Sequence, residues 1–291
     1  MSANIPRLIE PDSLQSMLAS TPIGSATIGS DNLIIVDLCN PALYRQKHVP
    51  GAVHLQPGLL MAGTAPCPGK LPTIEQLQEI IDSLGIDHNS HLVIYDDEGG
   101  GWAGRFAWTL DLLGYQNWSY LNGGIVAWIN EGYATESAEQ PPAFPSAPQY
   151  EGNAPVGIRN PSVLMNADQI VSQLDNPNFA VWDARSPGEY CGDMVRSARG
   201  GHIPGAINIE WTALMDEQRN LRIRGDAEEI LDRAGLGRDK QITTHCQSHH
   251  RSGFTYMVMR ILGYENISAY DGSWAEWGNL DHTPVQRGFS A

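Results

Sequence analysis

The sequence predicts an α/β protein built from two duplicated domains, each with a mainly parallel sheet flanked by helices. Short apolar segments that read as strands alternate with segments of helical length and spacing, and this alternation is typical of parallel sheets. The second half of the 291 residues also repeats motifs of the first half in the same order. A repeat of this length indicates that a whole domain was duplicated.

Two pairs of segments carry the repeat. An apolar strand that ends in aspartate and leads to a P-G-A box occurs in residues 34–55 and again in 179–209. Further along, residues 92–128 match 241–277, with Leu-Gly-Tyr, glycine and tryptophan recurring at one constant offset. We therefore expect the two halves to fold alike.

The two copies differ at the residue that can carry chemistry. At the constant offset Asp97 is the counterpart of Cys246, so the first copy offers no thiol there. Residues 1–140 are accordingly predicted to form a non-catalytic domain, and residues 161–291 a catalytic one. The proline-rich stretch 141–160 between them predicts a linker.

Local sequence predicts the individual elements. Apolar residues at helical spacing predict helices over 73–84, 226–234 and 252–262. The β-branched segment 240–245 predicts a short strand that ends just before the cysteine. The chain must then turn from a strand end into a helix start within residues 246–251.

Such a turn makes Cys246 the candidate nucleophile. Backbone N–H groups in a strand-to-helix turn can point at one position, where the helix dipole adds positive potential. A cysteine at this position is held as a thiolate, the form that attacks electrophiles. Cys39, Cys67 and Cys191 have no comparable setting and are expected to be non-catalytic.

Composition narrows the class of protein. The net charge of −15 argues against binding to nucleic acid or to an anionic membrane. The sequence contains no apolar run long enough to span a bilayer, and its first residues do not resemble a secretory signal. Its four cysteines are not spaced like a disulfide framework. These features predict a cytoplasmic protein.

The length of the cysteine loop separates two kinds of chemistry. Cysteine-dependent protein phosphatases share a C-x5-R loop whose N–H groups surround a phosphate, whereas Cys246 to Arg251 is C-x4-R. A tighter ring suits one sulfur atom on the cysteine and crowds three phosphate oxygens. Loop length therefore favours sulfur transfer over phosphate or arsenate chemistry.

The histidines of the loop leave several readings open. His245, His249 and His250 form a metal-like set with Cys246, but six consecutive residues can hardly place four ligands tetrahedrally, so no metal site is expected. His249 and His250 could be proton donors, could aid anion binding, or could be solvated. An imidazole beside the thiolate can also lower its pKa.

Together these features resemble a tandem-domain rhodanese, a thiosulfate:cyanide sulfurtransferase. The resemblance rests on the duplicated halves, the D-x-R and H-I-P-G-A motifs of the second half, the loop C-Q-S-H-H-R and the G-S-W-x-E-W segment. The loop is close to that of a subset of bacterial rhodaneses. The resemblance implies two rhodanese-like domains, an inactive N-terminal copy, and ping-pong sulfur transfer through a cysteine persulfide without a metal or organic cofactor.

The resemblance also implies roles for individual residues. Cys246 would carry the persulfide, Arg185 would bind the anionic donor, and Asp183 would hold loop groups in place. Trp211 could wall the pocket, with core packing as the alternative. The residues expected to surround the substrate in the loop are Gln247, Ser248, His249, His250 and Arg251.

Two alternatives concern the arginines. Arg185 could instead be a surface residue paired with Glu189, four positions on. The second half also carries an insertion, residues 194–201, that brings Arg196 and Arg199. A solvated loop is the simpler interpretation of this insertion, and attraction of the substrate is the other.

The predicted function is transfer of sulfane sulfur from thiosulfate to cyanide or another thiophilic acceptor. The loop lacks the patterns from which thiosulfate and 3-mercaptopyruvate preferences are usually read, so 3-mercaptopyruvate remains an alternative donor. A persulfide carrier or sensor that delivers sulfur to a protein partner is the second alternative.

Overall fold

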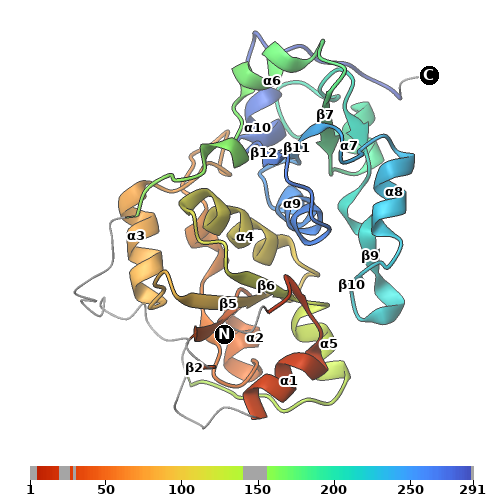
Figure 1. Cartoon of the computed structure of the whole chain (residues 1–291). Helices are drawn as coiled ribbons and strands as arrows, with labels where there is room; N and C mark the ends of the chain where they lie inside the picture. The colour runs from red at the N-terminus through yellow and green to blue at the C-terminus, as the bar shows by residue number, and fades with distance from the viewer. Residues whose placement is uncertain (1–4, 20–26, 29–30, 140–155, 290–291) are drawn as a thin grey trace. The chain divides into compact units, whose positions relative to one another are not determined.

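The computed structural model describes residues 5–19, 27–28, 31–139 and 156–289 and divides the chain into two compact units (Figure 1). Unit 1 comprises residues 1–60, 72–159 and 216–222, and unit 2 comprises residues 61–71, 160–215 and 223–291. Two short segments, 61–71 and 216–222, thus fold with the opposite half of the sequence, which the repeat does not predict. Most of the predicted linker, residues 141–155, lies outside the described residues.

Unit 1 is built around a sheet in the order β1-β6-β5-β3-β2, with β4 paired to β3. Only the β2–β3 pair among these described strands is antiparallel. Helices α3 and α4 cover one face, and α1, α2 and α5 cover the other (Figure 1). The elements are β1 Leu8–Ile9, α1 Pro11–Ala19, β2 Thr27–Ile28, β3 Asp31–Asp37, α2 Pro41–Gln46, β4 Val53–His54, η1 Pro57–Leu60, α3 Ile74–Ser83, β5 Ser90–Tyr95, α4 Gly101–Leu113, β6 Trp118–Leu121, α5 Gly124–Asn130 and η4 Glu217–Arg219.

Unit 2 contains the parallel sheet β12-β11-β7-β8. Figure 1 shows α9 and α10 on opposite sides of β11 and β12. The hairpin β9–β10 marks where the chain leaves unit 2 and returns to it. The elements are η2 Pro161–Val163, α6 Ala167–Gln173, β7 Phe179–Asp183, α7 Pro187–Cys191, β8 Ile207–Asn208, η3 Trp211–Leu214, β9 Met215–Asp216, β10 Arg222–Ile223, α8 Ala227–Arg233, β11 Gln241–His245, α9 Arg251–Ile261, β12 Ile267–Ala269 and α10 Ser273–Trp277.

Local signals in the sequence explain where the elements begin. Thr73 and Gln76 form a reciprocal capping box at the start of α3, and Ser186 and Glu189 form another at the start of α7. The predicted strand 240–245 is observed as β11, and the predicted helix after the cysteine loop is observed as α9. The α/β fold class with two similar, mainly parallel sheets is therefore confirmed.

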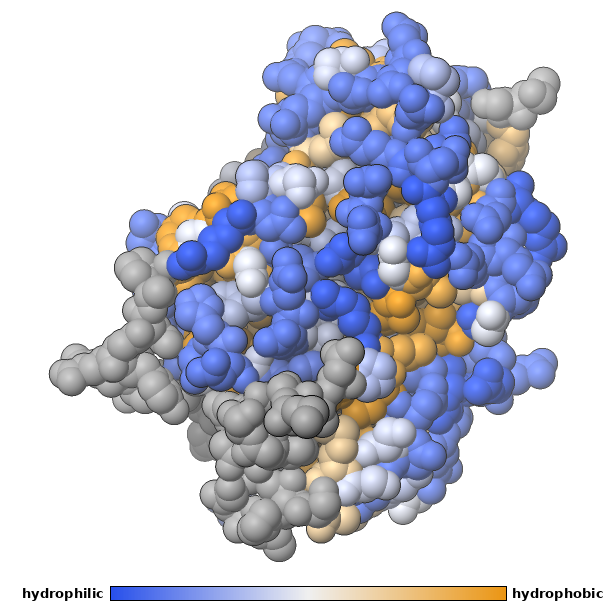
Figure 2. All heavy atoms as spheres, viewed as in Figure 1, coloured by the Kyte–Doolittle hydropathy of each residue, from blue (hydrophilic) through white to orange (hydrophobic). Residues whose placement is uncertain are grey.

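Apolar side chains are concentrated under the helices. In unit 1 Leu14, Ile125 and Trp128 pack on the sheet in one buried cluster, and in unit 2 Ile170 and Trp277 belong to a corresponding cluster. The face shown in Figure 2 is largely hydrophilic. Within the described parts of the chain, no helix is long and apolar enough to cross a membrane.

Candidate active site

Cys246 directly follows β11 at the carboxyl edge of the sheet of unit 2, and its side chain is buried. The loop backbone is fixed by the start of α10. Trp274 N–H donates to the Cys246 carbonyl at 2.9 Å, and Ala275 N–H donates to the Gln247 carbonyl at 3.0 Å. The Cys246 N–H in turn donates to Ser273 Oγ at 3.3 Å. These bonds hold the cysteine at one position in the turn.

The surroundings of the sulfur favour a thiolate. Burial alone would raise the pKa of the Cys246 thiol, but the Arg251 guanidinium and hydrogen bonds from the Ser252 hydroxyl and the Ser252 and Ser248 N–H groups outweigh it. The pKa of Cys246 therefore lies below its ordinary value. A buried cysteine whose pKa is lowered in this way is chemically able to act as a nucleophile.

Arg251 is held by a residue whose role the sequence did not reveal. Its Nη1 and Nη2 donate to the two carboxylate oxygens of Glu189 at 2.6 and 2.9 Å. Arg196, from the insertion, lies 3.2 Å from the same carboxylate. Burial opposes ionisation of Glu189, but its bonds from Arg251 and Ser186 keep its pKa below the ordinary value. The guanidinium beside Cys246 is thereby fixed in orientation.

Arg185 lies in the interior of unit 2, with 1% of its surface exposed. Its Nε donates to Asp183 Oδ1 at 2.9 Å, its Nη2 donates to the Gly201 carbonyl at 2.8 Å, and its guanidinium stacks 4.3 Å from the Trp274 ring. The alternative of a surface pair with Glu189 is wrong, because Asp183 is the partner. This placement favours a positioning role for Arg185 over direct contact with a donor.

Asp183 connects this arginine to the strand that carries the cysteine. Asp183 and His245 face each other at the ends of β7 and β11, with 3.5 Å between Oδ2 and Nε2. Burial lowers the pKa of His245, although the Asp183 carboxylate opposes the change. Burial disfavours ionised Asp183, but His245 and Arg185 hold its pKa below the ordinary value. Asp183 thus connects the ends of β7 and β11 and holds Arg185 in the loop after β7.

The remaining predicted residues surround the loop from the side of α9 and η3. His249 has its Nδ1 2.7 Å from Ser252 Oγ, and His250 lies edge-on to Trp211 at 5.6 Å between ring centres. Trp211 also packs edge-on against Phe254. Among the residues that the structure describes, no group of three or more His, Cys, Asp or Glu side chains is placed to hold a metal ion.

The insertion 194–201 contacts the loop through a backbone carbonyl and a side-chain hydroxyl. Gln247 Nε2 donates to the Arg196 carbonyl and to Ser197 Oγ, both at 3.3 Å. Ser197 Oγ donates to the Trp274 carbonyl at 3.1 Å. The insertion is therefore a support of the site and more than a solvated loop.

A segment from the first half of the sequence also reaches this loop. Residues 61–71 belong to unit 2, where Lys70 Nζ pairs with Asp271 at 2.8 Å and Leu71 N–H donates to the same carboxylate at 3.0 Å. Gly69 lies so close to the loop that a Cβ there would be 2.3 Å from the Ser248 carbonyl oxygen. No motif in the sequence marks this contact.

The corresponding loop of unit 1 corrects one expectation. Trp274 N–H donates to the Cys246 carbonyl, and its equivalent Ile125 N–H donates to the Asp96 carbonyl at 3.1 Å. Asp96 also directly follows β5, as Cys246 follows β11. The counterpart of Cys246 is therefore Asp96 and not Asp97, because the strand is displaced by one residue relative to the rest of the repeat.

The Asp96 carboxylate occupies the turn of unit 1. It accepts four backbone hydrogen bonds, at 2.8 to 3.1 Å, from the N–H groups of Glu98, Gly100, Trp102 and Ala103. The strand-to-helix turn of this unit thus surrounds an anion that belongs to the chain itself.

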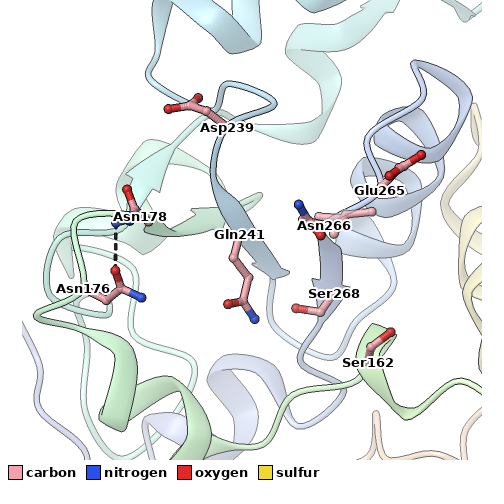
Figure 3. Close-up of a pocket in the computed structure, with 9 residues that line it drawn as sticks. Ser162, Asn176, Asn178, Asp239, Gln241, Glu265, Asn266 and Ser268 are labelled. Carbon is pink, nitrogen blue, oxygen red and sulfur yellow. Dashed lines mark hydrogen bonds between the residues drawn. The ribbon is translucent and has the colours of Figure 1, made fainter.

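An open hollow with polar walls lies at the other edge of the unit 2 sheet (Figure 3). It is formed where β11 begins at Gln241 and β12 begins at Ile267, whereas Cys246 follows the opposite end of β11. The cysteine chemistry is therefore separate from this hollow. Its polar lining residues are Ser162, Asn176, Asn178, Asp239, Gln241, Glu265, Asn266 and Ser268.

The chain is similar to known proteins along nearly its whole length. The model of the rhodanese-like domain matches residues 24–131 and 166–280. The chain is 44% identical to a thiosulfate sulfurtransferase of Azotobacter vinelandii and 43% identical to one of Pseudomonas aeruginosa, in each case over 98% of both chains. A 3-mercaptopyruvate sulfurtransferase of Escherichia coli is 28% identical over 84% of each chain.

Solved structures show the same fold. The crystal structure of YnjE superposes with a TM-score of 0.83 at 21% identity, covering 98% of this chain and 69% of that one. The family model matches both halves of the chain, and the two relatives at 43–44% identity match it over nearly its full length. The chain belongs to the rhodanese family and contains two rhodanese-like domains.

Proposed function

We propose that this protein is a thiosulfate sulfurtransferase that carries sulfur as a persulfide on Cys246. The observation that carries the proposal is the buried Cys246 thiol, whose pKa is lowered by Arg251 and by hydrogen bonds from Ser248 and Ser252. Membership of the family and the names of two relatives at 43–44% identity support the choice of reaction.

The first half-reaction transfers the outer sulfur of thiosulfate to the enzyme. The Cys246 thiolate attacks this sulfur, a new S–S bond forms, and the S–S bond of thiosulfate breaks. Sulfite leaves with the electron pair of the broken bond. Because the attacking group is already a thiolate, no general base is needed at this step.

The second half-reaction returns the enzyme to its starting state. The terminal sulfur of the persulfide rests among the N–H groups of loop residues 247–251, which stabilise its negative charge. Cyanide or another thiophile attacks this sulfur, the persulfide S–S bond breaks, and the Cys246 thiolate leaves. With cyanide the product is thiocyanate.

The arginines divide between binding and support. Arg251 lies beside the sulfur and keeps 20% of its side chain exposed, so it can attract an incoming anion. Arg196 shares Glu189 with it and is 55% exposed. Arg185 is committed to Asp183 and the Gly201 carbonyl, so we assign it the support of the sheet edge under the site.

Intact mass spectrometry tests the reaction class. Incubation with thiosulfate is expected to add the mass of one sulfur atom, and cyanide is expected to remove it. Cys246→Ser is expected to show no such gain, whereas Cys191→Ser, a control outside the turn, is expected to gain it normally. No mass change in the parent protein would overturn the proposal.

Two alternative functions are distinguished from this reaction by experiment. The likeness to a 3-mercaptopyruvate sulfurtransferase makes that compound the second candidate donor, and comparison of kcat/KM for the two donors decides between them. A persulfide carrier would instead hold its sulfur stably and turn over slowly with cyanide. The proposed partners are thus a small anionic donor and a thiophilic acceptor, in the cytoplasm.

A further inference from the structure

His249 has an unusual backbone for its residue type. Its φ is +56°, in the left-handed region that non-glycine residues seldom occupy, and its side chain is fully buried. The residue at the same place in unit 1, three positions after Asp96 as His249 is three after Cys246, is Gly99, with a φ of +87°. Glycine meets the backbone requirement without strain. An imidazole at this position therefore needs a reason in its side chain.

The side chain of His249 reaches the sulfur through one intermediate group. Its Nδ1 lies 2.7 Å from Ser252 Oγ, and the Ser252 hydroxyl is one of the groups that lower the pKa of the Cys246 thiol. Ser252 lies in the first turn of α9 and is fully buried. Ser252 thus connects the His249 imidazole to the Cys246 sulfur inside unit 2.

The protons available on these groups determine which of them donates in each hydrogen bond. A serine hydroxyl has one proton to donate and two lone pairs to accept with. If that proton is given to the Cys246 thiolate, the short contact between Ser252 Oγ and His249 Nδ1 requires a proton on Nδ1. If Nδ1 is instead unprotonated, it competes with the sulfur for the Ser252 proton.

We propose that His249 is a positioning residue: its Nδ1–H donates to Ser252 Oγ and thereby commits the Ser252 proton to the Cys246 sulfur. The inference rests on the proposed function for its purpose, since a committed donor stabilises the thiolate that attacks the sulfur donor. It assigns no chemical step to the imidazole. No proton is transferred, and His249 does not contact the substrate.

Other charged groups also act on the sulfur and have to be kept constant in a test. Arg251 at the start of α9 is the cation that lowers the pKa of Cys246, and Glu189 from α7 holds that guanidinium. Asp183 at the end of β7 and His245 at the end of β11 face each other behind the loop. Substitutions at His249 and Ser252 leave these four groups in place.

Two substitutions at His249 separate its backbone from its side chain. Asparagine tolerates a positive φ and carries an amide N–H that can donate to Ser252 Oγ, whereas glycine keeps the backbone and removes the donor. We expect His249→Asn to keep most of the thiolate character and His249→Gly to lose it. The readout is the pH dependence of Cys246 alkylation by iodoacetamide, which does not require sulfur transfer.

The expected result is a rise in the apparent thiol pKa of about one unit in His249→Gly, which lowers the thiolate fraction below that pKa about tenfold. Ser252→Ala is expected to give the same rise, and the double variant no further rise. His282→Asn, an exposed control, is expected to alkylate like the parent. Circular dichroism checks that each variant is folded.

The outcomes are distinct. Alkylation of His249→Gly with the parent pH profile, or equal loss in His249→Gly and His249→Asn, would overturn the role of the Nδ1 donor. If His249→Gly fails to fold, Ser252→Ala and His249→Asn decide, because the proposal requires the first to shift and the second not to. A parent that alkylates as expected but never takes sulfur from thiosulfate would refute the proposed function and leave the positioning role standing.

Discussion

The two units use one kind of turn around two different anions. In unit 1 the Asp96 carboxylate fills the turn and accepts four backbone N–H groups. In unit 2 the same place holds the sulfur of Cys246, whose pKa is lowered by Arg251, Ser252 and Ser248. The strand-to-helix turn supplies backbone N–H groups in both units. The first residue of the turn, Asp96 or Cys246, determines whether a thiol is present there.

The second difference lies one strand away. Asp37 in unit 1 and Asp183 in unit 2 both end a strand and accept the N–H of the residue two places on, which is Cys39 in one and Arg185 in the other. Asp37 accepts a hydrogen bond from the Tyr95 hydroxyl, and burial raises its pKa in spite of this bond. Unit 2 provides cations for a buried carboxylate, whereas unit 1 favours its neutral form.

The largest expected effect comes from exchanging the first residues of the turns. Cys246→Asp is expected to reduce sulfur transfer to background, because a carboxylate cannot form a persulfide. Asp96→Cys in the same chain is expected not to restore it, since Gly101, which carries no charge, begins α4 where Arg251 begins α9. Thiocyanate formation measures both. Restored turnover in the double variant would mean that the turn alone makes a cysteine reactive.

A large loss of stability is expected from Arg185→Ala. Arg185→Ala removes one partner of a buried ion pair and leaves the Asp183 carboxylate without its guanidinium, and such losses are about 3–5 kcal/mol. Urea unfolding measures the change. Arg199→Ala is not a suitable control because that arginine is also engaged by backbone carbonyls, whereas the exposed Arg233→Ala is expected to change stability little. A small change at Arg185 together with a raised KM for thiosulfate would restore it as the donor-binding residue.

Loss of the internal anion is expected to destabilise unit 1. Asp96→Ala leaves backbone N–H groups without their acceptor, and we expect a cost of about 3 kcal/mol. Asp97→Ala is the matched control, because the neighbouring carboxylate accepts one longer bond, from Asn40 N–H at 3.3 Å. The unfolding transition of unit 1 measures both. Equal effects of the two substitutions would contradict the assignment of Asp96 as the counterpart of Cys246.

The smallest expected effect concerns pH. The raised pKa of Asp37 stabilises unit 1 fully below the ordinary value of 3.8, and this contribution is lost as the pH rises through the folded-state pKa. The lowered pKa of Asp183 acts oppositely: its contribution is present above 3.8 and is lost as the pH falls through the folded-state pKa. Asp37→Asn is therefore expected to flatten the stability of unit 1 above pH 3.8. An unchanged profile would show that Asp37 is ionised in the fold.

Sequence predicted the parts of the site that depend on local pattern. The β-branched strand before Cys246 and the apolar helix after it specify the turn, and the turn makes Cys246 the candidate nucleophile. The role of Arg185 was not accessible, because an arginine after a strand can face either the solvent or a buried carboxylate. Glu189 was seen only as a helical neighbour, since its pairing with Arg251 joins residues far apart in the chain.

Two further features were hidden for physical reasons. The displacement that makes Asp96 the counterpart of Cys246 follows from strand pairing, which a comparison at constant offset does not detect. Residues 61–71 are held in unit 2 by bonds from Lys70 and Leu71 to the Asp271 carboxylate. Gly69 also packs closely against the Ser248 carbonyl. Such contacts leave no periodic trace in sequence.

Residues 61–71 and 216–222, which each fold with the opposite half of the sequence, determine whether the two halves can be expressed as separate proteins. Unit 2 needs residues 61–71 from the first copy, and unit 1 needs residues 216–222 from the second. A gene broken in the linker would therefore encode two incomplete folds, each lacking a piece carried by the other. The first copy carries no cysteine in its turn, yet deletion of that copy would also remove residues 61–71 from unit 2.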